Sequence, residues 1–168
     1  FPKGDPEAPL IQMGLGTVDV SKPVILCIGH NVVPSVGIID YMKDNKFEDK
    51  MEVVGLCCTA IDNSRYFDRA KIVGPISWEL RAIRGGFADV VVLDEQCVRT
   101  DCALEAERID VPVIAASEKN CVGYKNRTND PVDEIVNDLV SRKVPGVLIL
   151  DPEKVGEVAV RVEQKVVH

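Results

Sequence analysis

The chain has 168 residues, 46% of them hydrophobic, which is enough for one globular domain with a sizeable core and excludes a disordered protein. Its 20 Lys and Arg residues against 27 Asp and Glu residues give a net charge of −7, which argues against nucleic acid or an anionic membrane surface as the main partner. No apolar run approaches the ~18 residues that a transmembrane helix needs, so we expect a cytoplasmic protein without a membrane span.

The first 21 residues differ in composition from the rest of the chain. They open with Pro2, Gly4, Pro6 and Pro9, and they lack the basic start and uninterrupted apolar stretch of a secretory signal. We expect residues 1–21 to be a linker, residues 22–168 to form the domain, and the chain to be part of a longer protein.

Short apolar runs alternate with helix-like segments along the domain. The apolar runs predict strands at 24–28, 51–56, 88–93, 111–115 and 144–150. The intervening periodic segments predict helices that begin at Pro34 and cover 75–84, 100–108, 131–142 and 153–167. Gly85 and Gly86 provide a helix end, and Asp130 before Pro131 is expected to cap the next helix. Residues 64–70 show no clear pattern.

This alternation predicts right-handed βαβ units. We therefore expect a Rossmann-like three-layer α/β/α fold with a mainly parallel sheet of about five strands. No G-x-G-x-x-G or phosphate-loop motif follows the first strand, so the fold class alone implies no nucleotide.

Polar and sulfur-containing residues follow three of the predicted strands. These are His30 after the first strand, Cys57 and Cys58 after the second, and Cys97 after the third. Because the carboxyl ends of parallel strands line one edge of a sheet, the fold brings these residues to the same rim. An imidazole with thiolates suits zinc, copper(I), nickel or an iron-sulfur centre, or a nucleophilic cysteine with its base.

Each candidate also has a purely structural interpretation. His30 can cap a strand end, and strand alternation predicts that Cys57 and Cys58 point to opposite sides, so that one of them packs inward. We expect Asp94 to accept backbone hydrogen bonds rather than to bind a metal. Cys97 follows polar residues, which favours a position in a loop.

The other cysteines carry no motif. No C-x-x-C pair exists in the sequence, which argues against a zinc ribbon or a ferredoxin-type cluster held by this chain alone. Cys27 lies inside an apolar run, and we expect it to be buried in the core. We also expect Cys102 and Cys121 to have packing roles only.

An ordered set of short motifs carries a specific family resemblance. The segments are IGHN at 28–31, GLCCTA at 55–60, AKIVGP at 70–75, VLDEQC at 92–97 and LDPEKVG at 150–156. In this order they resemble the catalytic subunit of nickel-dependent carbon monoxide dehydrogenases, above all its archaeal form, the alpha subunit of the acetyl-CoA decarbonylase/synthase complex. The resemblance covers most of the chain, from about residue 22 to the last predicted helix.

The resemblance implies a function and a ligand set. Enzymes of this family oxidise CO with water to CO2, two electrons and two protons at a nickel-iron-sulfur cluster, the C-cluster. Carried over to this sequence, the family's motifs imply His30, Cys58 and Cys97 as cluster ligands, with the choice between Cys57 and Cys58 the least certain.

The sequence also departs from the family. Its members are several times longer, and their remaining cluster cysteines and proton-shuttling residues have no counterpart here. We therefore expect the middle domain of a carbon monoxide dehydrogenase, inactive alone, with the remainder of the catalytic subunit and other subunits of its complex as partners. The alternatives are a cysteine-dependent hydrolase or transferase with a Cys-His pair, and a non-catalytic assembly module.

Overall fold

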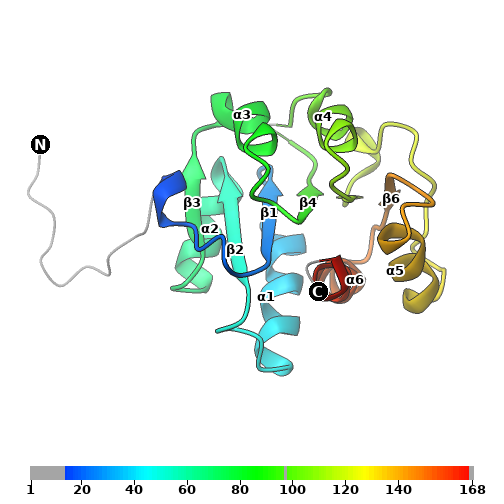
Figure 1. Cartoon of the computed structure of the whole chain (residues 1–168), viewed down its shortest axis with the longest axis horizontal. Coiled ribbons are helices and arrows are strands. Elements are labelled where there is room, and N and C mark those ends of the chain that lie inside the picture. Colours follow the sequence, from blue (N-terminus) through cyan, green and yellow to red (C-terminus); the bar gives the residue numbers. More distant parts are fainter. Residues whose placement is uncertain (1–13, 97, 167–168) are drawn as a thin grey trace, which may run out of the picture.

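The computed structural model of the chain describes residues 14–96 and 98–166, and these residues form one parallel sheet (Figure 1). Its strand order is β3-β2-β1-β4-β5-β6, the order of a doubly wound Rossmann sheet. The α/β fold is therefore confirmed, with six strands rather than about five. Their bounds are β1 (Val24–Ile28), β2 (Glu52–Leu56), β3 (Lys71–Gly74), β4 (Val90–Leu93), β5 (Val113–Ala115) and β6 (Gly146–Leu148).

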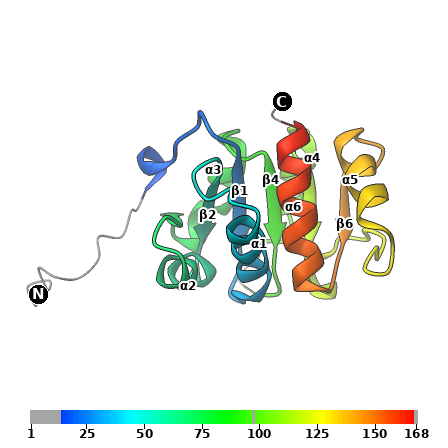
Figure 2. The same ribbon diagram turned by 90° about the horizontal axis from the view of Figure 1, so that it is seen from below.

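Helices cover both faces of the sheet, as expected for three layers. Figure 2 shows α1, α2, α5 and α6 on one face, and α3 and α4 on the other. The helices in the described residues are α1 (Val33–Asp44), α2 (Cys58–Tyr66), α3 (Glu79–Arg84), α4 (Cys102–Arg108), α5 (Val132–Val140) and α6 (Pro152–Val166).

The sandwiching of the sheet explains the unbroken apolar runs in the sequence. In β1, Ile25 and Cys27 pack into the core beneath α1, α5 and α6, whereas Leu26 and Ile28 pack into the core beneath α3 and α4. Every residue of β1 is buried, because alternate side chains point to opposite covered faces. Cys27 is a core residue, as predicted.

The structure adds two elements that the sequence did not predict, one on each side of the middle of the unclear segment 64–70. α2 begins at Cys58, inside a segment that the sequence places after a strand, and β3 forms the edge of the sheet beside β2. Buried Thr59, Ala60 and Asn63 hold α2 against the sheet. Packing of this face outweighs the weak helix propensity of its Thr, Asn and Ser residues.

The expected cap of α5 is wrong. Asp130 accepts no helix-capping bond, and Pro131 occupies the cap position instead. The Asp130 carboxylate pairs with buried Arg127, which also binds Asp138 at 2.9 Å. The Asp130 carboxylate therefore faces the buried guanidinium, which needs carboxylate partners, and does not cap α5.

α1 and α6 form the closest helix pair of the domain. Cβ atoms added at Gly37 or Gly156 would overlap backbone atoms of the partner helix. The two glycines thus let the helix backbones touch over β1 and β4. Gly86 ends the α3 segment with φ +69°, as its sequence position indicates.

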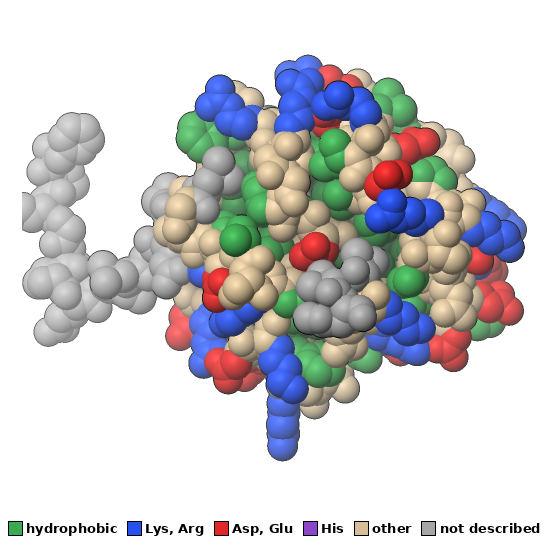
Figure 3. Space-filling view, in the orientation of Figure 1, with side chains coloured by type: hydrophobic (Ala, Val, Ile, Leu, Met, Phe, Trp, Pro, Cys, Tyr) green, Lys and Arg blue, Asp and Glu red, His purple; other side chains and the backbone are tan. Residues whose placement is uncertain are grey.

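The charges of the domain are distributed over its surface. The face seen in Figure 3 carries Lys and Arg side chains among Asp and Glu side chains. Glu105, for example, pairs with both Arg84 and Arg108. Within the described ranges, no helix is both long and apolar enough to cross a bilayer.

A carboxyl group of α6 lies fully inside the core. Glu163 of α6 is 0% exposed, and neither of its oxygens has a hydrogen-bond partner within the described residues. Burial, with a smaller contribution from the charge of Asp89, raises the pKa of Glu163 to about 9. Glu163 therefore holds its proton at neutral pH.

This raised pKa predicts a pH-dependent stability. The folded pKa of about 9 exceeds the ordinary value of 4.5, so the stabilising effect of the bound proton is complete below pH 4.5 and is lost as the pH rises toward 9. The loss is ~1.4 kcal/mol per pH unit. We expect Glu163→Gln to raise the free energy of unfolding at pH 7 and to flatten this decline.

Urea unfolding at pH 5, 7 and 9 measures the effect. Glu153→Gln, on the exposed first turn of the same helix, is the control and should leave the slope with pH unchanged. Equal slopes for the wild-type chain and Glu163→Gln would show that Glu163 is ionised in the folded state.

Candidate metal centre

The candidate site lies at the carboxyl edge of the sheet, between β1 and β4. These neighbouring strands lead to helices on opposite faces, because β1 runs into α1 and β4 leads to α4 (Figures 1 and 2). Such a switch point opens a crevice beyond the strand ends, where Rossmann-like proteins bind their ligands. His30 follows β1 at this point, and Asp94 to Gln96 follow β4.

A buried carboxylate joins the two loops. Asp94 is only 4% exposed, and its Oδ2 accepts the backbone N–H of His30 at 3.1 Å and that of Asn31. The expectation that Asp94 accepts backbone bonds is confirmed, although its partners lie on the β1 loop. Burial raises the pKa of Asp94, and the backbone N–H bonds act in the opposite direction.

Gly29 makes this contact possible. Its φ is +144°, and a Cβ at this position would overlap the Cβ of Asp94. Only glycine combines this backbone angle with the space that the carboxylate side chain occupies. Gly29, the glycine of the IGHN segment, therefore allows the Asp94 side chain at the end of β4 to pack against the β1 loop.

The β2 loop attaches to the same rim. The backbone N–H of Thr59 donates to the carbonyl of Gly29 at 3.1 Å. Cys58 directly precedes Thr59 and His30 directly follows Gly29, so this bond lies next to both candidate residues in the sequence. The buried Thr59 hydroxyl also lies 3.2 Å from the Ser35 hydroxyl. The loops after β1, β2 and β4 thus form one connected rim.

The two adjacent cysteines lie on the same side of the rim. Cys57 has φ +66° and ψ −152°, and Cys58 starts α2, so strand alternation does not apply to them. Their sulfurs are 3.9 Å apart, and both residues are partly exposed. The expectation that they point to opposite sides is wrong, because the chain turns from strand to helix between them. Two thiolates at this separation can reach one ion with metal–sulfur bonds of ~2.3 Å.

A hollow of about 330 Å³ opens at this rim, and His30, which is exposed, is among its lining residues. The Glu95 carboxylate beside it accepts from Lys119 Nζ at 2.7 Å, and this bond lowers the pKa of Glu95. Asn120 donates to the carbonyls of Asp94 and Glu95 at 2.6 and 2.8 Å, which holds the backbone after β4. The other lining residues are Asn31, Val32, Asp62 and Gln96.

Cys97 lies outside the described residues, but the segment after it is anchored. The backbone N–H of Arg99 donates to Glu79 Oε2 at 3.2 Å, and the Cys102 thiol lies 3.9 Å from the same oxygen. Glu79 is fully buried, and burial raises its pKa. Glu79 belongs to α3, and no motif in the sequence singles it out. Cys102 is buried, as expected, and burial raises its pKa to about 12.

The donor set fits part of a thiolate and imidazole site. Among residues 14–96 and 98–166, no three His, Cys, Asp or Glu side chains are close enough together to hold a metal ion by themselves. The rim nevertheless carries an imidazole, which lines the hollow, and two thiols, which are not among its lining residues; both are donors that soft metal ions and iron-sulfur clusters accept. The structure does not bring His30 and the two adjacent cysteines together into one metal-binding group.

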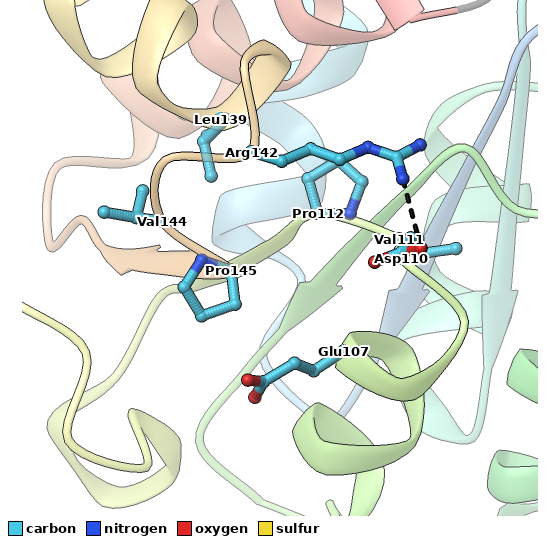
Figure 4. A pocket seen from close by; sticks show the side chains of 8 residues that line it. All are labelled: Glu107, Asp110, Val111, Pro112, Leu139, Arg142, Val144 and Pro145. Atoms are coloured by element: carbon cyan, nitrogen blue, oxygen red, sulfur yellow. Dashed lines mark ion pairs between the residues drawn. The ribbon is translucent and has the colours of Figure 1, made fainter.

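A second hollow of about 330 Å³ lies at the opposite, amino-terminal edge of the sheet (Figure 4). Its walls are mainly apolar, and its charged pair, Arg142 and Asp110, is joined at 3.2 Å. It carries neither a thiol nor an imidazole. The carboxyl edge is therefore the better candidate site.

Comparison with known proteins identifies related sequences. The family model described as the Prismane/CO dehydrogenase family matches residues 3–145. The alpha subunit of the acetyl-CoA decarbonylase/synthase complex of Methanothermobacter thermautotrophicus is 55% identical over 165 residues, which are 98% of this chain and 21% of that subunit. The corresponding subunit of Methanocaldococcus jannaschii is 50% identical over 162 residues, with 96% and 21% covered. The chain thus spans about a fifth of the length of these curated relatives.

Solved structures share the fold at lower sequence identity. Carbon monoxide dehydrogenase IV from Carboxydothermus hydrogenoformans aligns with a TM-score of 0.68 at 16% identity, over 94% of this chain and 22% of that one. Carbon monoxide dehydrogenase from Thermococcus sp. AM4 aligns with a TM-score of 0.68 at 22% identity, over 92% and 23%. These alignments support the α/β architecture of the domain.

The close approach at the rim predicts the cost of a side chain at Gly29. We expect Gly29→Ala to lower the free energy of unfolding by ~1–3 kcal/mol through overlap with Asp94, in addition to the backbone penalty. Gly86→Ala is the matched control, because Gly86 also has positive φ (+69°) but an added Cβ there meets no atom within 4 Å. Denaturant unfolding compares the two variants, and equal costs would contradict a tight Gly29–Asp94 contact.

Proposed function

The chain belongs to the Prismane/CO dehydrogenase family, and from this premise we propose that it is the middle domain of a nickel-dependent carbon monoxide dehydrogenase. In the complete enzyme it supplies part of the ligand set of the nickel-iron-sulfur cluster. The reaction is CO + H2O → CO2 + 2 electrons + 2 protons. The homologous archaeal alpha subunits favour a place in an acetyl-CoA decarbonylase/synthase complex.

The connected rim is the observation that carries this proposal. Bonds from Thr59 to Gly29 and from His30 to Asp94 join the loops after β1, β2 and β4. Those three loops contain the three residues that the family motifs assign as ligands, namely His30, Cys58 and Cys97. The parallel topology brings the ends of β1, β2 and β4 to one edge of the sheet, which supports a shared site for these residues.

The roles of these residues follow from their chemistry. His30 offers a neutral imidazole nitrogen from an exposed position, and Cys58 offers a thiolate from the first turn of α2. Cys97 is proposed as a further thiolate on the loop that Asp94 and Glu79 flank. When bound, the cluster supplies the redox chemistry and the site where CO and water react.

The proposal also requires a larger protein. The remaining ligands, the electron-transfer clusters and the proton-shuttling groups come from the other four fifths of a catalytic subunit of the length seen in the relatives. Its open hollow at the rim gives this domain a surface that another domain can close. The 168-residue chain alone is then expected to be inactive.

This function predicts a loss of nickel when a ligand is removed. In the complete subunit, purified anaerobically, we expect His30→Ala, Cys58→Ser and Cys97→Ser to lower the nickel content and CO oxidation by at least ~10-fold, because each removes a metal ligand. Cys121→Ser, which replaces a partly exposed cysteine that no family motif assigns as a ligand, is the control. Metal analysis and a CO-oxidation assay measure both effects.

Three outcomes would contradict the proposal. Normal nickel content in the His30→Ala variant would remove His30 from the site. CO oxidation by the 168-residue chain after reconstitution with iron, sulfide and nickel would show that the chain is complete rather than part of an enzyme. Absence of nickel from the wild-type subunit would favour a non-catalytic assembly module.

The alternative of a cysteine-dependent hydrolase or transferase needs an activated thiol. A nucleophilic cysteine has a lowered pKa, because its thiolate is the reactive form. The pKa of Cys58 is instead raised, chiefly by its hydrogen bond with the Cys57 thiol. A raised pKa argues against an activated nucleophile at Cys58.

Thiol labelling separates these two functions. At pH 7 we expect iodoacetamide to modify the partly exposed cysteines slowly, and to modify Cys27 and Cys102 only after unfolding, because burial raises the pKa of both to about 12. Mass spectrometry of the digested chain gives the rate at each site. Selective, rapid alkylation of Cys58 or Cys97 in the folded chain would instead support the nucleophile.

A further inference from the structure

We propose that Asp94 is a positioning residue, which orients His30, the proposed ligand on the loop after β1, without itself binding the metal. The inference rests on the proposed function, since it assigns a role toward the same cluster. It adds a residue to which the family motifs assign no role.

The two bonds from Asp94 fix the backbone on both sides of His30. The N–H of His30 belongs to the peptide group before its Cα, and the N–H of Asn31 belongs to the peptide group after it. Both donate to Asp94 Oδ2. With both flanking peptide groups held, the direction of the His30 side chain depends only on its own rotamer.

Asp94 is itself held from several directions. Its backbone N–H donates to the carbonyl of Ile28 at 3.0 Å, and its carbonyl accepts from Asn120 Nδ2 at 2.6 Å. Its side chain fills the space that Gly29 leaves open. Because Asp94 is fixed in this way, its bonds hold the β1 loop at a defined position relative to β4.

The same contacts prevent Asp94 from acting as a ligand. The side chain is 4% exposed, and Oδ2 is used by two backbone donors. The residues that line the hollow on this loop are Glu95 and Gln96 rather than Asp94. Asp94 therefore acts on a metal through His30.

Asp89 provides a matched control at the other end of β4. Its carboxylate is also partly buried, and its Oδ2 accepts the backbone N–H of Val24 at 2.8 Å. Burial raises the pKa of Asp89 as it does that of Asp94. The two residues share their chemistry and their strand, but Asp89 lies at the edge opposite the rim.

Amide hydrogen exchange tests the contact in the 168-residue chain. We expect Asp94→Ala to accelerate exchange at the His30 and Asn31 amides by roughly tenfold or more, since a charged acceptor is lost, and Asp94→Asn, which keeps an acceptor oxygen, to have a smaller effect. Asp89→Asn should leave both amides at wild-type rates. Unchanged exchange in Asp94→Ala, or in Asp94→Asn if the alanine variant does not fold, would overturn the proposal.

Nickel affinity in the complete subunit tests the role toward the metal. We expect the Asp94 variants to weaken nickel binding roughly tenfold to a hundredfold, the range for a group that orients a ligand, and to alter the electron paramagnetic resonance spectrum of the cluster. Asp89→Asn should do neither. Faster amide exchange with nickel affinity and spectrum equal to those of Asp89→Asn would reduce Asp94 to a structural residue and overturn the inference.

The two failures are distinguishable. If His30→Ala also retains nickel, the error lies in the proposed function, because His30 is then not a ligand. If His30→Ala loses nickel while the Asp94 variants keep it, the function stands and the positioning role is wrong.

Discussion

The contact of the Asp94 carboxylate with the loop after β1 determines how the candidate site is built. A buried carboxylate is costly unless its oxygens are hydrogen-bonded, and the His30 and Asn31 amides meet this requirement. The same bonds join the loops that follow β1 and β4, although these loops lead to helices on opposite faces of the sheet. The rim is therefore rigid where two sequence-distant loops meet, and open where the hollow begins.

The neighbouring β2 loop relies on unusual backbone geometry. Cys57 has a backbone conformation that is almost restricted to glycine, at φ +66° and ψ −152°. Such a conformation costs ~1–3 kcal/mol and persists only where the surroundings enforce it. Here the buried Thr59 side chain and the Thr59 to Gly29 bond hold the turn, and its effect is to bring two sulfurs within 3.9 Å.

Sequence patterns were sufficient for most of the fold. Buried strands such as β1 appear as continuous apolar runs because both faces are covered. β3 is a short edge strand that begins at Lys71, and α2 contains weak helix formers, so neither gives a periodic signal.

The details of the site lay beyond sequence patterns. The partners of Asp94 are 63 and 64 residues away, and the turn at Cys57 contradicts simple strand alternation. The position of Cys97 relative to His30 stays a prediction. Topology can be derived from local patterns, whereas hydrogen bonds between distant loops depend on tertiary packing.

The packing of α6 on α1 has a consequence for biosynthesis. The last helix of the domain touches the first helix through Gly37 and Gly156, and its side chains complete the core over β1 and β4. A ribosome delivers α6 only after every strand has emerged, so this side of the nascent sheet stays uncovered until then. Such late closure by sequence-distant contacts favours slow folding and a need for protection by chaperones during translation.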